Sequence, residues 1–113
     1  MQRDLLLLSE IIGAIERIIQ IAGDVDLESP ELDRDRIDAL LWNFTVLGEA
    51  SNQVSDDIKT DHADVPWSDP VRLRNRIVHG YWSVDLDVLL ATAHNDLPAM
   101  LLSIRAAREG IEP

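Results

Sequence analysis

Apolar residues recur at helical spacing in every long stretch of this 113-residue chain, and no stretch alternates apolar and polar residues at period two. This pattern restricts the fold more than any other feature, because helices must bury their apolar faces against one another. In the first stretch the apolar stripe consists of Leu5, Leu8, Ile12, Ile15, Ile19 and Ala22. Leu6, Ile11 and Ile18 widen this surface, which predicts contact with two neighbouring helices or with a second copy of the chain. We therefore expect an all-α protein.

The first helix should end at Gly23, and an acidic linker follows it. Asp24 and Asp26 have the spacing of a calcium loop, but Ser29 stands where such a loop needs glycine, so no calcium site is predicted. A second helix is expected from Pro30, with Ser29 as its N-cap, to about residue 56. Its core stripe comprises Ile37, Leu40, Leu41, Phe44, Leu47, Ser51 and Val54. A second face carries Trp42, Val46, Glu49 and Gln53.

A short third helix should follow a loop at residues 57–69. Asp69 is the expected N-cap and Pro70 the first helical residue, because proline lacks the N–H that this position leaves unpaired. Gly80 should end the helix by adopting the left-handed conformation. The third helix therefore holds the residues between Pro70 and Gly80.

The last helix is expected to begin near Ser83 or Asp85. Its buried side comprises Leu86, Leu89, Leu90, Ala93, Leu97, Met100, Leu101 and Ile104. Pro98 lies inside this pattern and should kink the helix or split it, with Asn95 or Asp96 as a new cap. The predicted fold is an up-and-down four-helix bundle with a short third helix and a kinked last helix, in one domain over residues 1–113.

Composition excludes several functional classes. The chain has no cysteine, so it can form neither a disulfide nor a thiolate zinc site. It shows no signal-peptide pattern, and its first apolar run, Leu5 to Leu8, is far too short for a membrane span. We therefore expect a soluble, cytoplasmic protein. Its net charge of −11 disfavours broad nucleic-acid binding through many bases, but permits a small basic pocket.

Positive charge is concentrated in the third helix. Arg72, Arg74 and Arg76 lie within five residues, just before His79 and Tyr81. On an α-helix Asn75 and His79 share a face, so the amide could bond the imidazole and select its tautomer. Arg74 and His79 are about 140° apart around the axis and about 7.5 Å apart along it. Either the long arginine side chain or two chains meeting at this helix would have to bring them together.

These residue types suit phosphate chemistry. Histidine can give or take a proton near neutral pH, and arginine binds phosphate oxygens through paired hydrogen bonds. Together they could cleave RNA without a metal: the base takes the 2′-hydroxyl proton, the hydroxyl attacks the adjacent phosphate, and arginine stabilises the developing charge. The end of a helix favours protonated His79, whereas the neighbouring arginines oppose it. Judged by spacing alone, an arginine–histidine pair of this kind is more often structural than catalytic.

The remaining aromatic and histidine residues suggest no separate site. His62 and His94 lack partners at metal-ligand spacing, so no metal site is predicted. The three tryptophans are expected to be core or interface anchors rather than stacking platforms for bases; they are Trp42, Trp67 and Trp82. Tyr81 and Trp82 could simply pack back onto the bundle.

The segment Arg74-Asn75-x-x-x-His79-x-Tyr81 resembles the RNxxxHxY motif of the HepT-like toxins in the HEPN superfamily. Its surroundings are similar to that family along most of the chain. The similar segments are Arg36-Ile37-Asp38-Ala39-Leu40, Leu47-Gly48-Glu49-Ala50, Val65-Pro66-Trp67 and Asp96-Leu97-Pro98. The resemblance implies a HEPN-like helical domain that dimerises and brings two motifs into one cleft.

The resemblance also implies a metal-independent endoribonuclease without a cofactor. Arg74 and His79 would be catalytic, and Asn75 and Arg76 would support them. The implied partner is a minimal nucleotidyltransferase antitoxin, which can transfer AMP to Tyr81. The added bulk and negative charge would then obstruct a site that holds RNA phosphate. Glu49 could pair with a motif arginine or remain a solvated glutamate.

Three functions follow from these patterns. The leading hypothesis is a ribonuclease toxin controlled by its nucleotidyltransferase partner. The second is a non-catalytic helical subunit of a nucleotidyltransferase that contributes to its nucleotide or substrate pocket. The third is a plain dimerisation bundle, in which Arg72, Arg74 and Arg76 only neutralise acids of neighbouring helices. Burial of all three head groups in ion pairs would favour this third hypothesis.

Overall fold

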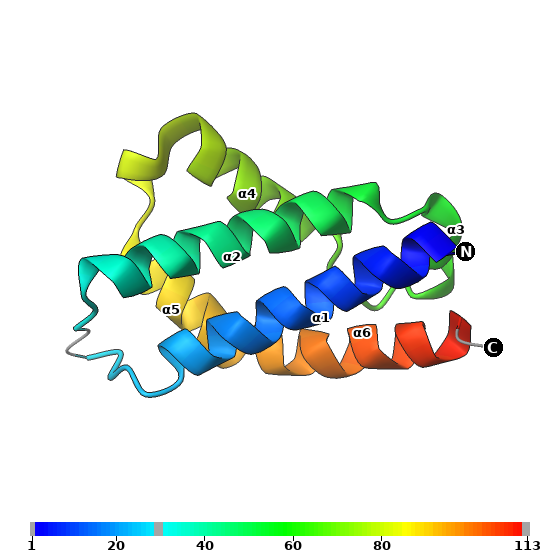
Figure 1. Ribbon diagram of the computed structural model, residues 1–113, viewed down its shortest axis with the longest axis horizontal. Helices are drawn as coiled ribbons and strands as arrows, with labels where there is room; N and C mark the ends of the chain where they lie inside the picture. The colour runs from blue at the N-terminus through cyan, green and yellow to red at the C-terminus, as the bar shows by residue number, and fades with distance from the viewer. Residues whose placement is uncertain (1, 29–30, 112–113) are drawn as a thin grey trace.

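The computed structural model describes residues 2–28 and 31–111, and the regular structure in these residues is entirely helical (Figure 1). Its six α-helices are α1 (Gln2–Ala22), α2 (Arg34–Gln53), α3 (Asp56–Asp61), α4 (Ser68–Gly80), α5 (Leu86–Asn95) and α6 (Leu97–Ile111). A short 3-10 helix, η1 (Tyr81–Ser83), follows α4. The all-α prediction is therefore confirmed. Within the described residues, no helix combines the length and apolar character that crossing a membrane requires.

The helices are arranged as a row. α1 packs against α2 on one side and against α5 and α6 on the other, while α4 packs mainly on α2. Figure 1 shows α4, α2, α1 and α6 following one another across the view. The molecule measures 44 × 28 × 21 Å along its principal axes. This arrangement is compatible with a four-helix bundle in which α5 and α6 together form the last helix.

α1 occupies the centre of the core. Its buried apolar side chains include Leu8, Ile11, Ile15 and Ile18, each with no exposed surface. The same core cluster contains Phe44 and Leu47 of α2, Leu89 and Leu90 of α5, and Ile104 of α6. Leu6 remains 62% exposed, so the wide apolar surface predicted for the first helix is only partly covered. Burial of this continuous cluster is the main force that holds the helices together.

A buried carboxylate fixes the first turn of α1. Asp4 accepts hydrogen bonds from the backbone N–H of Ser55 at 3.0 Å and from its hydroxyl at 2.7 Å. Burial raises the pKa of the Asp4 carboxyl, but the two hydrogen bonds from Ser55, together with nearby positive charge that includes Arg3, lower the pKa overall. Ser55 is also the N-cap of α3, so one contact joins the start of α1 to the start of α3.

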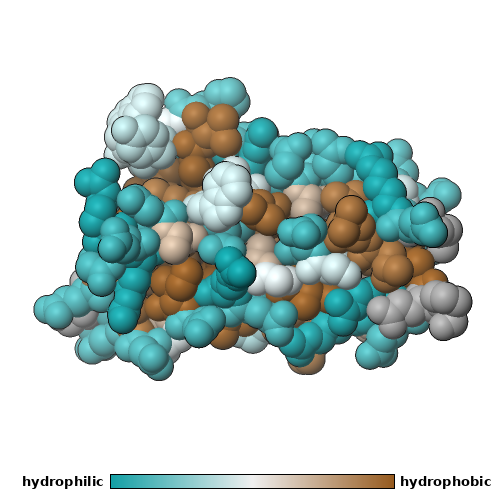
Figure 2. Space-filling model, viewed as in Figure 1, coloured by the Kyte–Doolittle hydropathy of each residue, from teal (hydrophilic) through white to brown (hydrophobic). Residues whose placement is uncertain are grey.

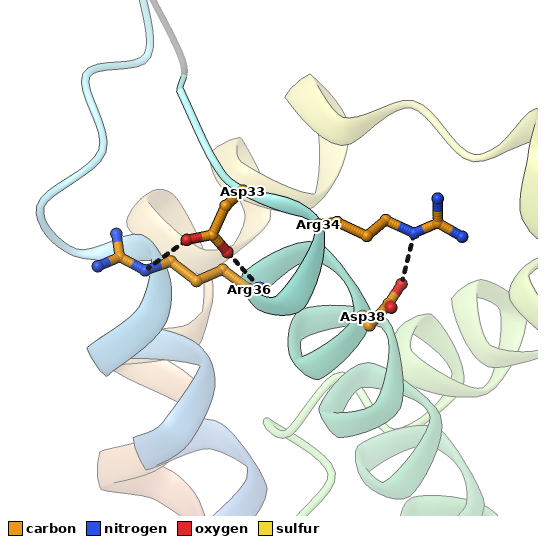
Figure 3. A network of polar contacts seen from close by, with 4 residues as sticks. All are labelled: Asp33, Arg34, Arg36 and Asp38. Carbon is orange, nitrogen blue, oxygen red and sulfur yellow. Dashed lines mark hydrogen bonds and ion pairs between the residues drawn. The ribbon is translucent and has the colours of Figure 1, made fainter.

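α2 begins later and ends earlier than the sequence predicted. Ser29 and Pro30, the expected cap and first residue, lie outside the described residues. The N-cap is Asp33, whose extended backbone lets its carboxylate accept from the N–H of Arg36 at 2.8 Å (Figure 3). Figure 3 also shows the ion pair between Arg34 and Asp38 in the first turns of α2.

The predicted loop at residues 57–69 is wrong in its first part. α2 ends at Gln53, and Asp56–Asp61 form α3. The cause is a second capping residue: the Ser55 side chain accepts from the N–H of Ile58 at 3.4 Å and starts a new helix. Ile58 is buried and attaches this short helix to the core.

The two ends of α4 also differ from expectation. α4 begins at Ser68, after Trp67, which has helical dihedral angles and makes no capping hydrogen bond. Asp69 lies inside the first turn and pairs with Arg72 instead of capping the helix. Gly80 ends the helix as predicted, but its φ of −173° is extended rather than left-handed.

The predicted break in the last helix is confirmed. α5 starts after the N-cap Asp85 and ends at Asn95, and α6 starts at Leu97. Pro98 lies in the first turn of α6, where its missing N–H breaks no helical hydrogen bond. Asp96 separates the segments, and its carbonyl oxygen accepts from the N–H of Met100 at 3.3 Å.

Candidate active site on α4

A glycine in α2 determines how closely α4 can pack. A Cβ atom added at Gly48 would lie 2.2 Å from Cβ of Arg74 and 2.5 Å from the carbonyl oxygen of Pro70. Both distances are shorter than any real contact, so the two helices can approach this closely only at a residue without a side chain. Gly48 therefore positions α4, and it places the next residue, Glu49, beside Arg74.

Arg74 is held by two neighbours. Its Nη2 lies 3.1 Å from Oε2 of Glu49, and its Nη1 donates to Oδ1 of Asn75 at 2.8 Å. The sequence left two options for Glu49, pairing with a motif arginine or remaining solvated, and the structure shows the pairing with Arg74. The Arg74 side chain is 30% exposed, and its buried Nε has no hydrogen-bond partner within the described residues. Such unpaired buried donors are uncommon and call for an explanation.

Asn75 does not make the contact that the helix spacing suggested. Among the described residues no hydrogen bond joins Asn75 to His79, and both residues are exposed. The amide oxygen of Asn75 instead accepts from the charged guanidinium of Arg74, which is a stronger donor than a neutral imidazole. Asn75 therefore orients the arginine rather than the histidine.

The other two motif arginines differ in their partners. Arg72 pairs with Asp69 and donates to the hydroxyl of Ser68 at 3.1 Å. Arg76 is exposed and makes no ion pair or hydrogen bond within the described part of the chain. The three head groups are therefore not all buried in ion pairs, which was the condition that would favour a plain dimerisation bundle.

The aromatic residues after α4 project from the molecule. Tyr81 is 62% exposed and Trp82 is 77% exposed, so neither packs back onto the helices. Their rings meet edge to face, with centroids 5.4 Å apart. Figure 2 shows pale and brown surface on the projection at the upper left, where Figure 1 has the end of α4 and η1.

Trp67 fulfils the prediction of a core anchor, because it is buried and donates to the carbonyl oxygen of His62 at 2.9 Å. Trp42 and Trp82 are exposed and belong to no core.

The role of Gly48 was not predicted from the sequence. A glycine inside an otherwise apolar helix face was the available signal, since it often marks a close approach of two backbones.

The structure does not bring Arg74 and His79 together within one chain. Arg74 points to Glu49 of α2, whereas His79 lies exposed in the last turn of α4. Arg72, Arg76 and His79 fall instead within about 60° of one another around the helix axis. Among the described residues, no three histidine or acidic side chains converge in a way that could hold a metal ion.

These features define a small all-helical protein whose helix α4 carries an arginine cluster and an exposed histidine. The chain belongs to the ribonuclease HepT-like family, whose model matches residues 11–107. A probable ribonuclease HepT of Thermococcus cleftensis is 31% identical over 82% of this chain and 84% of its own length.

Two candidate RNases of Methanocaldococcus jannaschii are more distant relatives. One is 26% identical over 80% of this chain and 84% of its own length. The other is 24% identical over 93% of this chain and 87% of its own length. No solved structure matches the chain.

Proposed function

We propose that this chain is a metal-independent endoribonuclease, built as one HEPN-like domain, that acts as the toxin of a cytoplasmic toxin–antitoxin pair. The observation that carries the proposal is the combination on α4 of a half-buried arginine held by Glu49 and Asn75 with an exposed histidine five residues later. Membership of a ribonuclease family supports the same activity.

The proposed reaction uses the two side chains for different tasks. Neutral His79 takes the proton of a ribose 2′-hydroxyl, and the oxygen attacks the adjacent phosphorus. The bond to the 5′-oxygen breaks, and that oxygen takes a proton from an imidazolium or from water. Arg74 stabilises the charge on the phosphoryl oxygens through its guanidinium group. Asn75 keeps the guanidinium oriented, and Arg76 supplies additional positive charge.

The assembly that we propose is a homodimer. Arg74 and His79 of one chain diverge around α4, so the arginine of one copy would act with the histidine of the other. Exposed apolar side chains in and directly after the motif support an interface there: Val78 is 51% exposed and Trp82 is 77% exposed. The two motifs would then form one cleft.

Control of the enzyme is proposed to act on Tyr81. Its ring is largely exposed two residues after His79, so a nucleotidyltransferase antitoxin can reach the hydroxyl. The phenol oxygen would attack the α-phosphorus of ATP, and pyrophosphate would leave. The attached AMP would place negative charge and bulk where RNA has to bind. Intact mass after co-expression with the antitoxin tests this step: an AMP-sized increment should appear and should be lost in Tyr81→Phe.

Replacing His79 tests the catalytic assignment. His79→Ala should reduce RNA cleavage at least about 100-fold, because it removes the proton acceptor. Circular dichroism should stay unchanged, since the side chain is exposed. His62→Ala is the matched control, because His62 lies in the turn after α3 and should leave the rate unaltered. Full activity of His79→Ala would contradict the assignment.

A second candidate function is a non-catalytic subunit of a nucleotidyltransferase. The observation in its favour is Arg76, which has no acidic partner in the described chain and could hold a nucleotide phosphate without any proton transfer. This function predicts nucleotide binding that depends on Arg76 and survives His79→Ala, without RNA cleavage by the wild type.

A further inference from the structure

A groove of about 490 Å³ lies between α4 and the α5–α6 pair. Phe44 and Leu47 of α2 contribute apolar side chains to it, and Val88 and Met100 line it from α5 and α6. Its volume falls within the range of small-molecule sites, which are usually apolar with a few polar groups. The sequence alone did not indicate this groove, because four helices contribute to it.

The charged side chains that line the groove favour a ligand with a single anionic group. Arg76 lines it and has no partner in the described residues, whereas Arg72 shares its charge with Asp69. Asp96 also borders the groove, so a polyanion does not fit along its whole length. An apolar, flat body with a single phosphate next to Arg76 fits both the apolar lining and the charge.

The groove lies next to the candidate catalytic histidine. His79 follows Arg76 by three residues, which places it about 60° around the helix and about 4.5 Å further along it. A phosphate bound by Arg76 would therefore lie within one nucleotide of the phosphate at which His79 acts.

We propose that this groove is a subsite for one nucleotide of the RNA substrate beside the cleaved phosphate, with the base in the apolar part and its phosphate on Arg76. The inference rests on the proposed ribonuclease function. Base faces are apolar and planar, and they gain from contact with exposed apolar side chains such as Val88, which is 50% exposed at the groove. Such a subsite would give the enzyme a preference for certain bases at one position.

The test is an NMR titration of the full chain with a 2′-O-methyl RNA trinucleotide, which cannot undergo 2′-hydroxyl attack. Amide shifts are expected at Val88, Thr92 and Met100. Val88→Trp should fill the groove and weaken binding at least tenfold, and Leu102→Trp should not. Leu102 is the matched control, because it is 67% exposed on α6 and does not line the groove.

A second variant keeps the test independent of folding. Val88 is 50% exposed, so Val88→Glu should be tolerated while its charge repels the phosphate and weakens binding to a similar degree. Unchanged affinity in both folded Val88 variants would overturn the proposal. Equal affinity for the trinucleotide and for its abasic analogue would also overturn it, because the base would then contribute nothing.

Titrations with further ligands distinguish a nucleotide of RNA from other anions as the occupant of the groove. A free 5′-mononucleotide that binds the groove as tightly as the trinucleotide would overturn the RNA subsite, as would inorganic phosphate with the same affinity. The titration does not depend on cleavage. Cleavage without groove shifts would refute the subsite alone, whereas groove binding without any cleavage by the wild type would refute the proposed function.

Discussion

At the scale of single residues, the state of Arg74 is the most informative feature of the site. The guanidinium is shared between the carboxylate of Glu49 and the amide of Asn75, and its Nε–H is buried without a partner in the described chain. A half-buried ion pair of this kind orients the arginine at the expense of some of its positive potential. A phosphate bound to Arg74 would compete with Glu49 and Asn75 for the guanidinium group.

We predict that Glu49→Gln lowers kcat/KM for RNA by less than about tenfold, because glutamine still accepts a hydrogen bond from Arg74. Arg74→Ala should lower it about 100-fold or more, because the charge itself is lost. Glu16→Gln is the matched control, since it breaks the 2.9 Å pair with Arg105, which lies between α1 and α6. A loss in Glu49→Gln as large as in Arg74→Ala would show that Glu49 takes part in the chemistry.

The buried carboxylate of Asp4 gives a prediction on stability and pH. Its pKa is lowered from the ordinary value of 3.8, so its stabilising effect is complete above that value and is lost as the pH falls through the native pKa. Asp4→Asn should reduce the free energy of unfolding by about 1–2 kcal/mol at pH 7. Denaturant titration should show that the difference in the free energy of unfolding between the wild type and Asp4→Asn shrinks below pH 3.8. A difference independent of pH would mean that the charge of Asp4 is unimportant.

At the scale of helices, the contact between α2 and α4 depends on Gly48. The buried residues of α4 are only Pro70, Ile77 and Gly80, so this close approach is a large part of its attachment. The position of the motif relative to Glu49 therefore depends on a residue that has no functional group of its own.

Gly48→Ala should destabilise the protein by about 1–3 kcal/mol, because α4 must move away to relieve the overlap. RNA cleavage should fall with it, since Arg74 moves away from Glu49. Gly13→Ala is a matched control in α1: nothing lies within 4 Å of an added Cβ there. It should stabilise the protein by up to about 1 kcal/mol, because alanine favours helix. Thermal unfolding of both variants checks the prediction, and equal effects of the two substitutions would contradict it.

The helices that could be predicted from sequence are those with long apolar stripes. The break at Pro98 was equally clear, because proline acts locally. The short helix α3 was missed, since its only buried residue is Ile58 and one residue shows no periodicity. The start of α2 was misplaced because Ser29 and Asp33 are both good caps, and local chemistry does not choose between them.

The site was predictable only in part. The motif residues were identified from sequence, and their catalytic roles stay predictions. For Tyr81 and for Glu49 the sequence left two options each, and the structure shows Tyr81 exposed and Glu49 paired with Arg74. The direction of Asn75 was not predicted, because helix spacing points to His79, whereas the long side chain of the adjacent Arg74 reaches the amide oxygen. The groove beside Arg76 was not foreseen either, since its lining depends on how α4 packs.

At the scale of the whole molecule, the proposed homodimer makes a prediction that a monomeric site does not. Arg74→Ala and His79→Ala are each expected to be inactive. Mixed and allowed to exchange chains, they should recover about a quarter of the wild-type activity, because half of the dimers are then mixed and each has one complete site. An RNA-cleavage assay against the mixing ratio checks this. No recovery after proven chain exchange would place both residues in one chain.

The order of the helices has a further consequence for the energy landscape of this protein. α1 has neighbours on both sides and eight buried residues, whereas α4 is supported mainly by α2 and has three. Local opening of α4 should therefore require much less free energy than global unfolding. The helix that holds the candidate catalytic residues can change position while the core of α1, α2 and α6 keeps its native structure.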